Sequence, residues 1–187
     1  MTKKRIVITG APGTGKTSVI LKLEEANFFC FHEVIRAMTQ EAKKSNGSNS
    51  IVSNPIVSVS DPYQFNTTIL NARIKQFTDA LSKVDDILFY DRGIPDVLAY
   101  MDYFDQKYED HFIDKCKKHV YDHVFILPPW KEIYISDEER FESFEQAEQI
   151  HYHLLNTYTD LGYDCIEVPF GTVAERNNFI LNNIKKY

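Results

Sequence analysis

The segment Gly10-Ala11-Pro12-Gly13-Thr14-Gly15-Lys16-Thr17 decides how this sequence is interpreted. It matches the pattern G-x-x-x-x-G-K-[ST] without a mismatch, and Ser18 follows it directly. Its glycines allow the backbone to wrap an anion with successive N–H groups pointing inward, and a helix beginning near Lys16 adds the positive end of its dipole. We therefore predict that residues 10–18 bind the phosphates of a nucleoside triphosphate.

Two side chains of this segment have expected roles of their own. Lys16 is expected to reach the β- and γ-phosphates and to act in catalysis, and the Thr17 hydroxyl is expected to bind Mg²⁺. ATP with Mg²⁺ is accordingly the expected cofactor. A guanine-specific GTPase is disfavoured, because no Asn-Lys-x-Asp element follows the expected strand at 121–127.

Strands alternate with helices along the rest of the chain. Strands are expected at 5–9, 28–31, 87–90, 121–127 and 164–168, and helices at 17–26, 33–38, 61–77, 95–104, 136–161 and 173–184. This alternation indicates βαβ units, and hence an α/β fold: a three-layer α/β/α sandwich with a mainly parallel five-stranded sheet. Without a linker or an internal repeat, residues 1–187 are expected to form a single nucleotide-binding domain.

Charged side chains follow two of the expected strands. Asp91 comes directly after the third strand, where a carboxylate can hold Mg²⁺ or its water, and Arg92 beside it has a planar fork suited to phosphate. Glu33 follows the second strand and is expected to take the proton of an attacking hydroxyl. The alternatives are a turn or helix cap for Asp91, a surface ion pair for Arg92, and helix capping or an Arg36 pair for Glu33.

Two further regions are expected to surround the site. Ser, Asn, Gly and Pro are dense in residues 45–61, which predicts a flexible surface loop. Residues 128–145 follow a proline-rich connection and are predicted to form a lid, whose Arg140, with Lys131, would neutralise charge on the transferred group. An exposed ion pair is the alternative for Arg140.

The composition indicates a soluble globular protein. A net charge of -6 disfavours nucleic acid as a partner, and no apolar run approaches the roughly 18 residues of a membrane span. Three cysteines without a Cys-x-x-Cys pair fit a reducing compartment, so a cytoplasmic location is expected. A homodimer is compatible with the sequence, which does not fix the oligomeric state.

The chain resembles the small P-loop ATP-binding family of AAA domain proteins, which includes the nicotinamide riboside kinase domain. The resemblance runs nearly end to end, and it is carried by Gly10 to Thr17, Phe31-His32-Glu33-Val34-Ile35-Arg36, Tyr90-Asp91-Arg92-Gly93, Leu127-Pro128-Pro129-Trp130, Asp137-Glu138-Glu139-Arg140 and Gly162-Tyr163-Asp164. More distantly the chain is similar to nucleoside and nucleotide kinases. The resemblance implies a kinase fold, ATP with Mg²⁺, and roles for Glu33, Asp91, Arg92 and Arg140.

Two functions follow from these observations. The first is a kinase that transfers the γ-phosphoryl group of ATP to a hydroxyl of a small, nucleoside-like acceptor, and Glu33 and the 45–61 loop favour it. The second is an ATP- or GTP-hydrolysing switch with a protein partner. A ring-forming AAA+ motor is disfavoured, because nothing in the sequence supplies its C-terminal helical domain.

Overall fold

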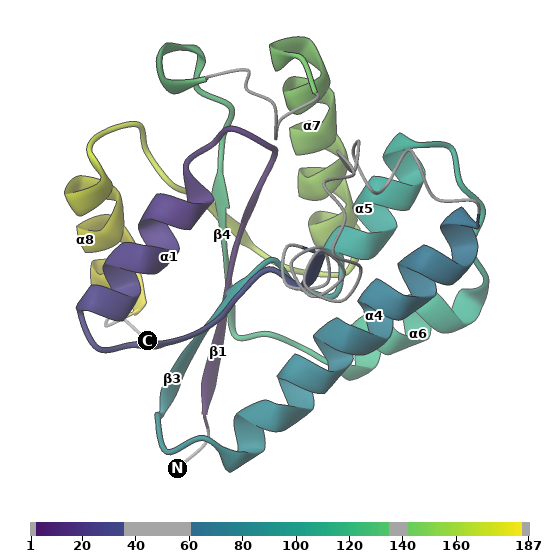
Figure 1. The fold of residues 1–187 in the computed structure, drawn as a ribbon, viewed down its shortest axis with the longest axis horizontal. Helices are drawn as coiled ribbons and strands as arrows, with labels where there is room; N and C mark the ends of the chain where they lie inside the picture. The colour runs from purple at the N-terminus through teal and green to yellow at the C-terminus, as the bar shows by residue number, and fades with distance from the viewer. Residues whose placement is uncertain (1–2, 36–60, 135–141, 185–187) are drawn as a thin grey trace, which may run out of the picture.

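A parallel sheet lies at the centre of the described chain. The computed structural model describes residues 3–35, 61–134 and 142–184. Within them, five strands pair in the order β2-β3-β1-β4-β5, and all pairs are parallel (Figure 1). The strands are β1 (Lys4–Gly10), β2 (Phe29–Phe31), β3 (Ile87–Asp91), β4 (His123–Leu127) and β5 (Cys165–Glu167). The expected parallel sheet is therefore confirmed. The observed strand ends differ from the expected ones by no more than two residues.

Helices cover both faces of this sheet, as Figure 1 shows. Helices α1 (Lys16–Glu25) and α8 (Val173–Ile184) pack on one face. The other face is covered by α4 (Pro62–Asp79), α5 (Asp96–Tyr103), α6 (Asp110–Lys118) and α7 (Phe144–Asp160). Two short 3₁₀ helices lie at η1 (Ala80–Ser82) and η2 (Lys131–Ile133). The arrangement is the three-layer α/β/α sandwich that the alternation of strands and helices predicts.

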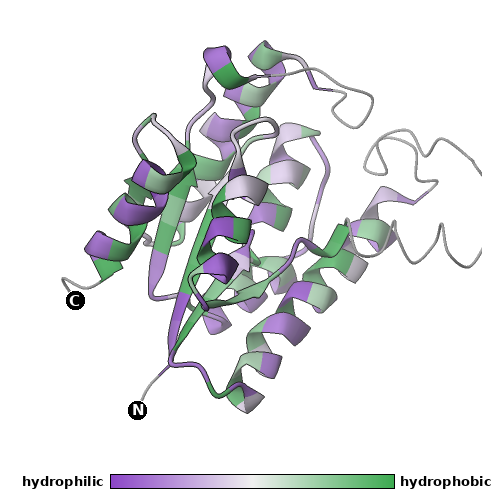
Figure 2. Cartoon of the chain, turned by 60° about the vertical axis from the view of Figure 1, so that its left-hand side comes forward, coloured by the Kyte–Doolittle hydropathy of each residue, from purple (hydrophilic) through white to green (hydrophobic). Residues whose placement is uncertain are grey.

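Strand β1 shows why the sheet has two apolar cores. Ile6 and Ile8 pack with α1 and α8, whereas Val7 packs with the α4–α7 side, and all three are fully buried. Successive side chains of a strand point to opposite faces, so an almost continuous apolar run suits a central strand covered on both sides. Figure 2 shows the same pattern, with hydrophobic strands inside and hydrophilic residues on the outer faces of the helices.

Capping side chains set the starts of two helices. The Asp61 carboxylate accepts a hydrogen bond from the Gln64 N–H at 2.9 Å, which confirms the expected start of α4. The expected start of the long helix, Ser136, is wrong. Ser143 and Gln146 form a reciprocal capping box, so α7 begins at Phe144 instead.

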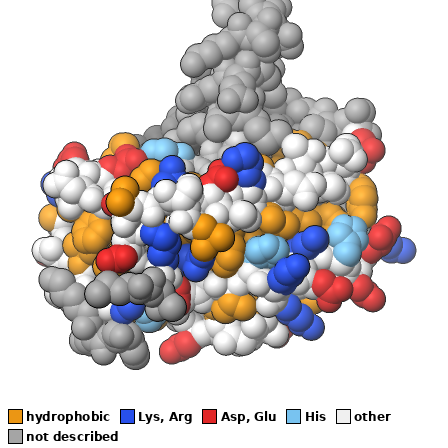
Figure 3. Space-filling view, turned by 90° about the horizontal axis from the view of Figure 1, so that it is seen from below, with side chains coloured by type: hydrophobic (Ala, Val, Ile, Leu, Met, Phe, Trp, Pro, Cys, Tyr) orange, Lys and Arg blue, Asp and Glu red, His pale blue; other side chains and the backbone are white. Residues whose placement is uncertain are grey.

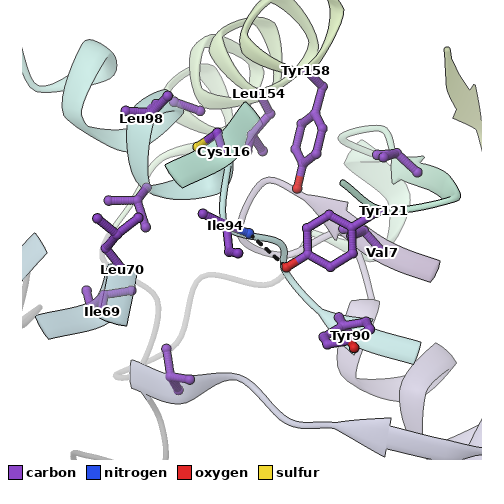
Figure 4. Packing of buried hydrophobic residues seen from close by; sticks show 14 of the residues in the cluster. Val7, Ile69, Leu70, Tyr90, Ile94, Leu98, Cys116, Tyr121, Leu154 and Tyr158 are labelled. Carbon is purple, nitrogen blue, oxygen red and sulfur yellow. Dashed lines mark hydrogen bonds between the residues drawn. The ribbon is translucent and has the colours of Figure 1, made fainter. Parts of the chain in front are cut away.

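The core on the α4–α7 side fixes the segment that follows β3. The Tyr121 hydroxyl accepts a hydrogen bond from the Ile94 N–H at 3.2 Å, as drawn in Figure 4. Tyr121 also packs edge to face on Tyr90, with ring centroids 5.2 Å apart. Ile94, which is fully buried, therefore anchors the segment after β3 through both its backbone N–H and its side chain.

Parallel pairing brings several chain segments to one edge of the sheet. Ile8 of β1 lies opposite Asp91 of β3, and Gly10 lies opposite Leu127 of β4. Glu33 follows β2 at the same edge, because β2 pairs with β3 in parallel. The carboxyl edge of a parallel sheet is where α/β proteins bind ligands, so the fold places the candidate residues together.

Candidate active site

The glycines of the 10–17 loop adopt backbone conformations that other residues rarely reach. Gly13 has φ 77° and Gly15 has φ 83°. A Cβ at Gly13 would lie 2.6 Å from the ring of Tyr134, and one at Gly15 would lie 2.8 Å from Nη1 of Arg176. Glycine at these two positions thus permits both the turn and the close packing around it.

The loop opens directly into helix α1. Gly15 is the N-cap and supplies no capping side chain, and the first turn contains no acidic residue. The N–H groups at the start of α1 therefore meet no competing carboxylate from their own turn, and the helix dipole adds positive potential there. This is the electrostatic setting that phosphate requires.

Lys16 lies inside the loop instead of extending into solvent. Its side-chain ammonium donates a hydrogen bond to the Ala11 carbonyl at 2.7 Å, and the residue is 9% exposed. Burial and the neighbouring Arg92 guanidinium lower the pKa of Lys16 to about 7, although nearby carboxylates act in the opposite direction. Additional negative charge in the loop would stabilise the protonated ammonium.

Arg92 is held in an unusual conformation at the end of β3. Its φ is 74°, which is uncommon for a residue with a side chain, and its N–H donates to the Ile8 carbonyl at 3.0 Å. Its guanidinium lies 3.1 Å from Asp96 and 3.3 Å from the Gly10 carbonyl. Burial opposes its charge, but Tyr100 and three carboxylates outweigh that effect and raise the pKa of Arg92.

Asp96 is the hydrogen-bonding centre of this arrangement, and it is 0% exposed. Besides Arg92, it accepts hydrogen bonds from the Thr9 hydroxyl at 2.7 Å, the Tyr158 hydroxyl at 2.6 Å and the Gly93 N–H at 3.0 Å. Burial alone would raise the pKa of Asp96, but Arg73, Arg92 and the two hydroxyls lower it below its usual value. Asp96 thus ties β1, α5 and α7 to Arg92.

Glu33 meets a buried arginine from α4. Its Oε1 lies 3.6 Å from Nη2 of Arg73 and accepts the Ile35 N–H at 3.2 Å. Arg73 is 3% exposed and also donates to the Gly93 carbonyl at 2.8 Å. The hydrogen bond to the Ile35 N–H is the kind of contact that the capping alternative for Glu33 expects. Glu33 also lines the cavity described below.

A single cavity of about 250 Å³ collects these groups. Part of its lining is the loop itself, through Pro12, Gly13, Gly15, Lys16, Thr17 and Ser18. Further charged and polar side chains come from Glu33, Asn66, Arg73, Asp91, Arg92, Asp96 and Glu142. Apolar side chains complete it: Ile35, Ile69, Val97 and Tyr100. One cavity thus combines a phosphate loop, two guanidinium groups and an apolar compartment.

Most of the sequence-predicted residues come together here. Gly10, Ala11 and Thr14 support the loop without lining the cavity, and the Thr14 hydroxyl donates to the Ala11 carbonyl at 3.0 Å. Arg140, Arg36 and residues 45–60 lie outside the described residues. Lys131 is exposed in η2.

Sequence reasoning missed Arg73, Asp96 and Asn66. Asn66 and Arg73 occupy the same side of α4 as Ile69, at helical spacing. Polar residues within an apolar stripe are the signal that could have drawn attention to this pair. Asp96 gave no such signal, because an acidic residue in a first helical turn is ordinary.

Magnesium fits the oxygen groups that line the cavity. The Thr17 hydroxyl and the Asp91 carboxylate are hard oxygen donors, and Asp91 is buried. The described chain holds no group of three or more His, Cys, Asp or Glu side chains placed to bind a metal. Magnesium at such a site therefore needs the phosphates and water as additional ligands.

Figure 3 shows how charge is distributed over the described residues on one face of the molecule. Lys and Arg side chains are interspersed there with acidic and apolar ones. Within the described residues, no helix combines the length and the apolar character that crossing a bilayer requires.

Comparison with known proteins identifies the family of this chain. The AAA domain family profile matches residues 5–176. No curated protein sequence gives a significant match.

Solved structures share the fold at low sequence identity. Deoxyadenosine kinase from M. mycoides with bound dATP is 16% identical, covers 97% of this chain and 99% of its own, and gives a TM-score of 0.65. The NadR protein in complex with NR is 16% identical with a TM-score of 0.73; the match covers 99% of this chain but 51% of NadR. Thymidylate kinase from Candida albicans is 15% identical, with 99% and 92% covered and a TM-score of 0.69.

Proposed function

This chain belongs to the AAA domain family of P-loop proteins, and we propose that it is an ATP-dependent kinase acting on a hydroxyl of a small, nucleoside-like acceptor. One observation carries the proposal: the phosphate loop and the Glu33–Arg73 pair line the same cavity. A hydrolase needs only the loop and a water molecule, whereas a kinase also needs a compartment for its acceptor. The apolar wall around Ile69 and Tyr100 provides such a compartment.

The donor end of the cavity would hold the triphosphate of ATP. Backbone N–H groups of residues 13–18 would bind its oxygens, and Lys16 would leave the Ala11 carbonyl to reach the β- and γ-phosphates. Thr17 and Asp91 would hold Mg²⁺, which would offset phosphate charge when bound. Arg92, whose guanidinium is hydrogen-bonded to Asp96, would neutralise charge on the transferred group.

At the acceptor end, Glu33 would act as the general base. The acceptor hydroxyl oxygen forms a bond to the γ-phosphorus, and its proton passes to the Glu33 carboxylate. The bond between the γ-phosphorus and the β–γ bridging oxygen breaks, and ADP leaves with that electron pair. Arg73, whose Nη2 lies 3.6 Å from Oε1 of Glu33, would hold this side chain in place beside the acceptor hydroxyl.

A product assay tests this function. The purified protein is incubated with ATP, Mg²⁺ and a panel of nucleosides, sugars and vitamins, and ADP and phosphorylated products are quantified by liquid chromatography with mass spectrometry. We expect equal amounts of ADP and of one phosphorylated product. A matched acceptor that lacks the reacting hydroxyl should yield neither.

Two results would contradict the proposal. ADP formed at the same rate with and without every acceptor would indicate hydrolysis, which is the expectation for a switch with a protein partner. Absence of measurable binding of both ATP and GTP in the presence of Mg²⁺ would exclude both the kinase and the switch.

A further inference from the structure

Arg176 is a buried cation that contacts the 10–17 loop from outside the cavity. It lies in the first turn of α8, which packs beside α1 (Figure 1). The residue is 6% exposed and is not among those that line the cavity. Its Nη1 donates a hydrogen bond to the Thr14 carbonyl at 3.0 Å. A guanidinium group from the C-terminal helix therefore holds the backbone of the loop.

The charge of Arg176 is not balanced by an acidic side chain. Among the described residues, no carboxylate lies within ion-pair distance of it. Burial alone lowers the pKa of Arg176, and its Nε is enclosed without a described hydrogen-bond partner. A buried charge without a counter-charge is costly, and an apolar side chain would pack there at lower cost. Packing of α8 thus does not account for an arginine at this position.

The hydrogen bond from Arg176 fixes the direction of one peptide group in the loop. The Thr14 carbonyl and the Gly15 N–H belong to the same planar unit, and in a trans peptide they point in opposite directions. Because Arg176 holds the carbonyl, the Gly15 N–H points away from the guanidinium, toward the cavity that Gly15 lines. This N–H donates to no described residue, so it is available to an anion.

Glycine at position 15 makes such a lock necessary. Gly15 has φ 83° and no Cβ, so rotation of the 14–15 peptide group meets little steric resistance. Reversal would turn the Thr14 carbonyl oxygen toward the cavity, where its partial negative charge would oppose a phosphate. The guanidinium also needs the missing side chain, because a Cβ at Gly15 would lie 2.8 Å from Nη1 and 3.1 Å from Nη2. Gly15 and Arg176 therefore form one unit.

We propose that Arg176 is a positioning residue of the phosphate loop, which locks the 14–15 peptide group so that the Gly15 N–H donates to a phosphate of the bound nucleotide. Arg176 acts through the backbone of the loop, and its positive charge adds to the potential that attracts phosphate. The inference rests on the nucleotide-binding part of the proposed function and not on transfer to an acceptor.

Asn177 provides a matched comparison on the same helix. It is 5% exposed, and its Nδ2 donates to the Val19 carbonyl of α1 at 3.2 Å. Like Arg176, it attaches α8 to a backbone carbonyl through a buried hydrogen bond, but it holds no peptide group of residues 10–17. If α8 had only a structural role, loss of either side chain would affect nucleotide binding alike.

Titration with ADP and Mg²⁺ compares the two side chains. Arg176→Met removes the donor and the charge but keeps an unbranched stem, so Kd should rise by roughly ten- to a hundredfold, the effect of losing one hydrogen bond to a charged group. Asn177→Leu should lower the midpoint of urea denaturation and leave Kd nearly unchanged. An unchanged Kd in Arg176→Met, or an equal rise in Asn177→Leu, would overturn the inference.

Nuclear magnetic resonance of the Gly15 N–H measures the direction of the peptide group. In the unmodified protein, ADP and Mg²⁺ should shift this proton resonance downfield, because the amide gains a charged acceptor. At saturating ADP the shift should be lost in Arg176→Met and kept in Asn177→Leu. A full shift in Arg176→Met would overturn the inference. A Gly15 resonance that does not move when ADP binds the unmodified protein would do so as well, even if the variant failed to fold.

Failure of this inference is distinguishable from failure of the kinase proposal. ADP binding with the expected Gly15 shift, but without any phosphorylated acceptor, would refute the kinase and support the role of Arg176. An active kinase with the same ADP affinity in Arg176→Met would support the kinase and refute that role. Absence of any nucleotide binding would refute both.

Discussion

The two ends of the cavity are built in different ways. The proposed phosphate end comes from one continuous segment, residues 10–18, whose backbone N–H groups would be its main ligands. The acceptor end is assembled from Glu33 after β2, Asn66 and Arg73 on α4, and Tyr100 on α5. Under the proposed function, side chains would provide the chemistry at this end.

This difference separates binding of the nucleotide from choice of the acceptor. A backbone loop recognises phosphate whatever molecule carries it, so the phosphate end can stay constant while the acceptor end changes. Asp96 joins the two ends, since it contacts Arg92 and the Gly93 N–H while Arg73 donates to the Gly93 carbonyl. Because the two ends are built from different segments, substitutions within each end should have separable effects, whereas a substitution at Asp96 should affect both.

The largest effect on turnover is expected at the acceptor end. Glu33→Gln keeps the shape of the side chain but removes the base, so kcat should fall by about 10² to 10⁴ while ATP affinity stays unchanged. Steady-state kinetics and equilibrium titration with a non-hydrolysable ATP analogue measure the two quantities. Unchanged turnover would remove Glu33 from the mechanism.

Breaking the connection between the two ends should cost stability. Asp96→Asn leaves Arg92 buried without its carboxylate partner, so the free energy of unfolding should fall by about 3–5 kcal/mol. Urea denaturation measures this. The control is Asp79→Asn, which breaks the exposed pair with Lys75 and should cost less than about 1 kcal/mol. Similar losses in the two variants would show that Asp96 does not hold the site together.

At the phosphate end, Lys16→Ala should reduce kcat/KM by about 10² to 10³, because one charged donor to the transferred phosphoryl group is lost. ATP affinity should fall as well, in contrast to Glu33→Gln. The comparison of the two variants in the same titration is the measurement. Loss of acceptor binding in Lys16→Ala, with ATP binding retained, would contradict the division between the two ends.

The smallest effect concerns pH. Because the pKa of Lys16 is about 7 in the free protein and bound phosphates raise it, nucleotide binding takes up a proton above pH 7. Affinity for a non-hydrolysable ATP analogue should therefore fall as pH rises from about 7.5 to 9, by at most about tenfold per pH unit. Calorimetry in buffers of different ionisation enthalpy measures the proton uptake. Lys16→Met should abolish that part of the pH dependence, and an equally steep fall in this variant would assign it to another group.

Local signals in the sequence predicted the proposed phosphate end and the layers of the fold. The spacing of Gly10, Gly15 and Lys16 specifies a backbone loop, and a loop of consecutive residues needs no distant partner to be recognised. The alternation of strands and helices likewise predicted the parallel sheet, because each strand needs a crossover helix before the next. The carboxyl edge then placed Glu33 and Asp91 near the loop.

Only the tertiary structure decided what surrounds those residues. Arg73 follows Glu33 by forty positions, and the partners of Asp96 come from β1, the β3–α5 connection and α7, so no local pattern reveals these contacts. The direction of the Asn66 amide depends in the same way on Gln106, forty residues away. The physical reason is that hydrogen-bond polarity and pKa depend on which groups folding brings within a few ångströms, whereas a helix, a strand or a phosphate loop depends on neighbours along the chain.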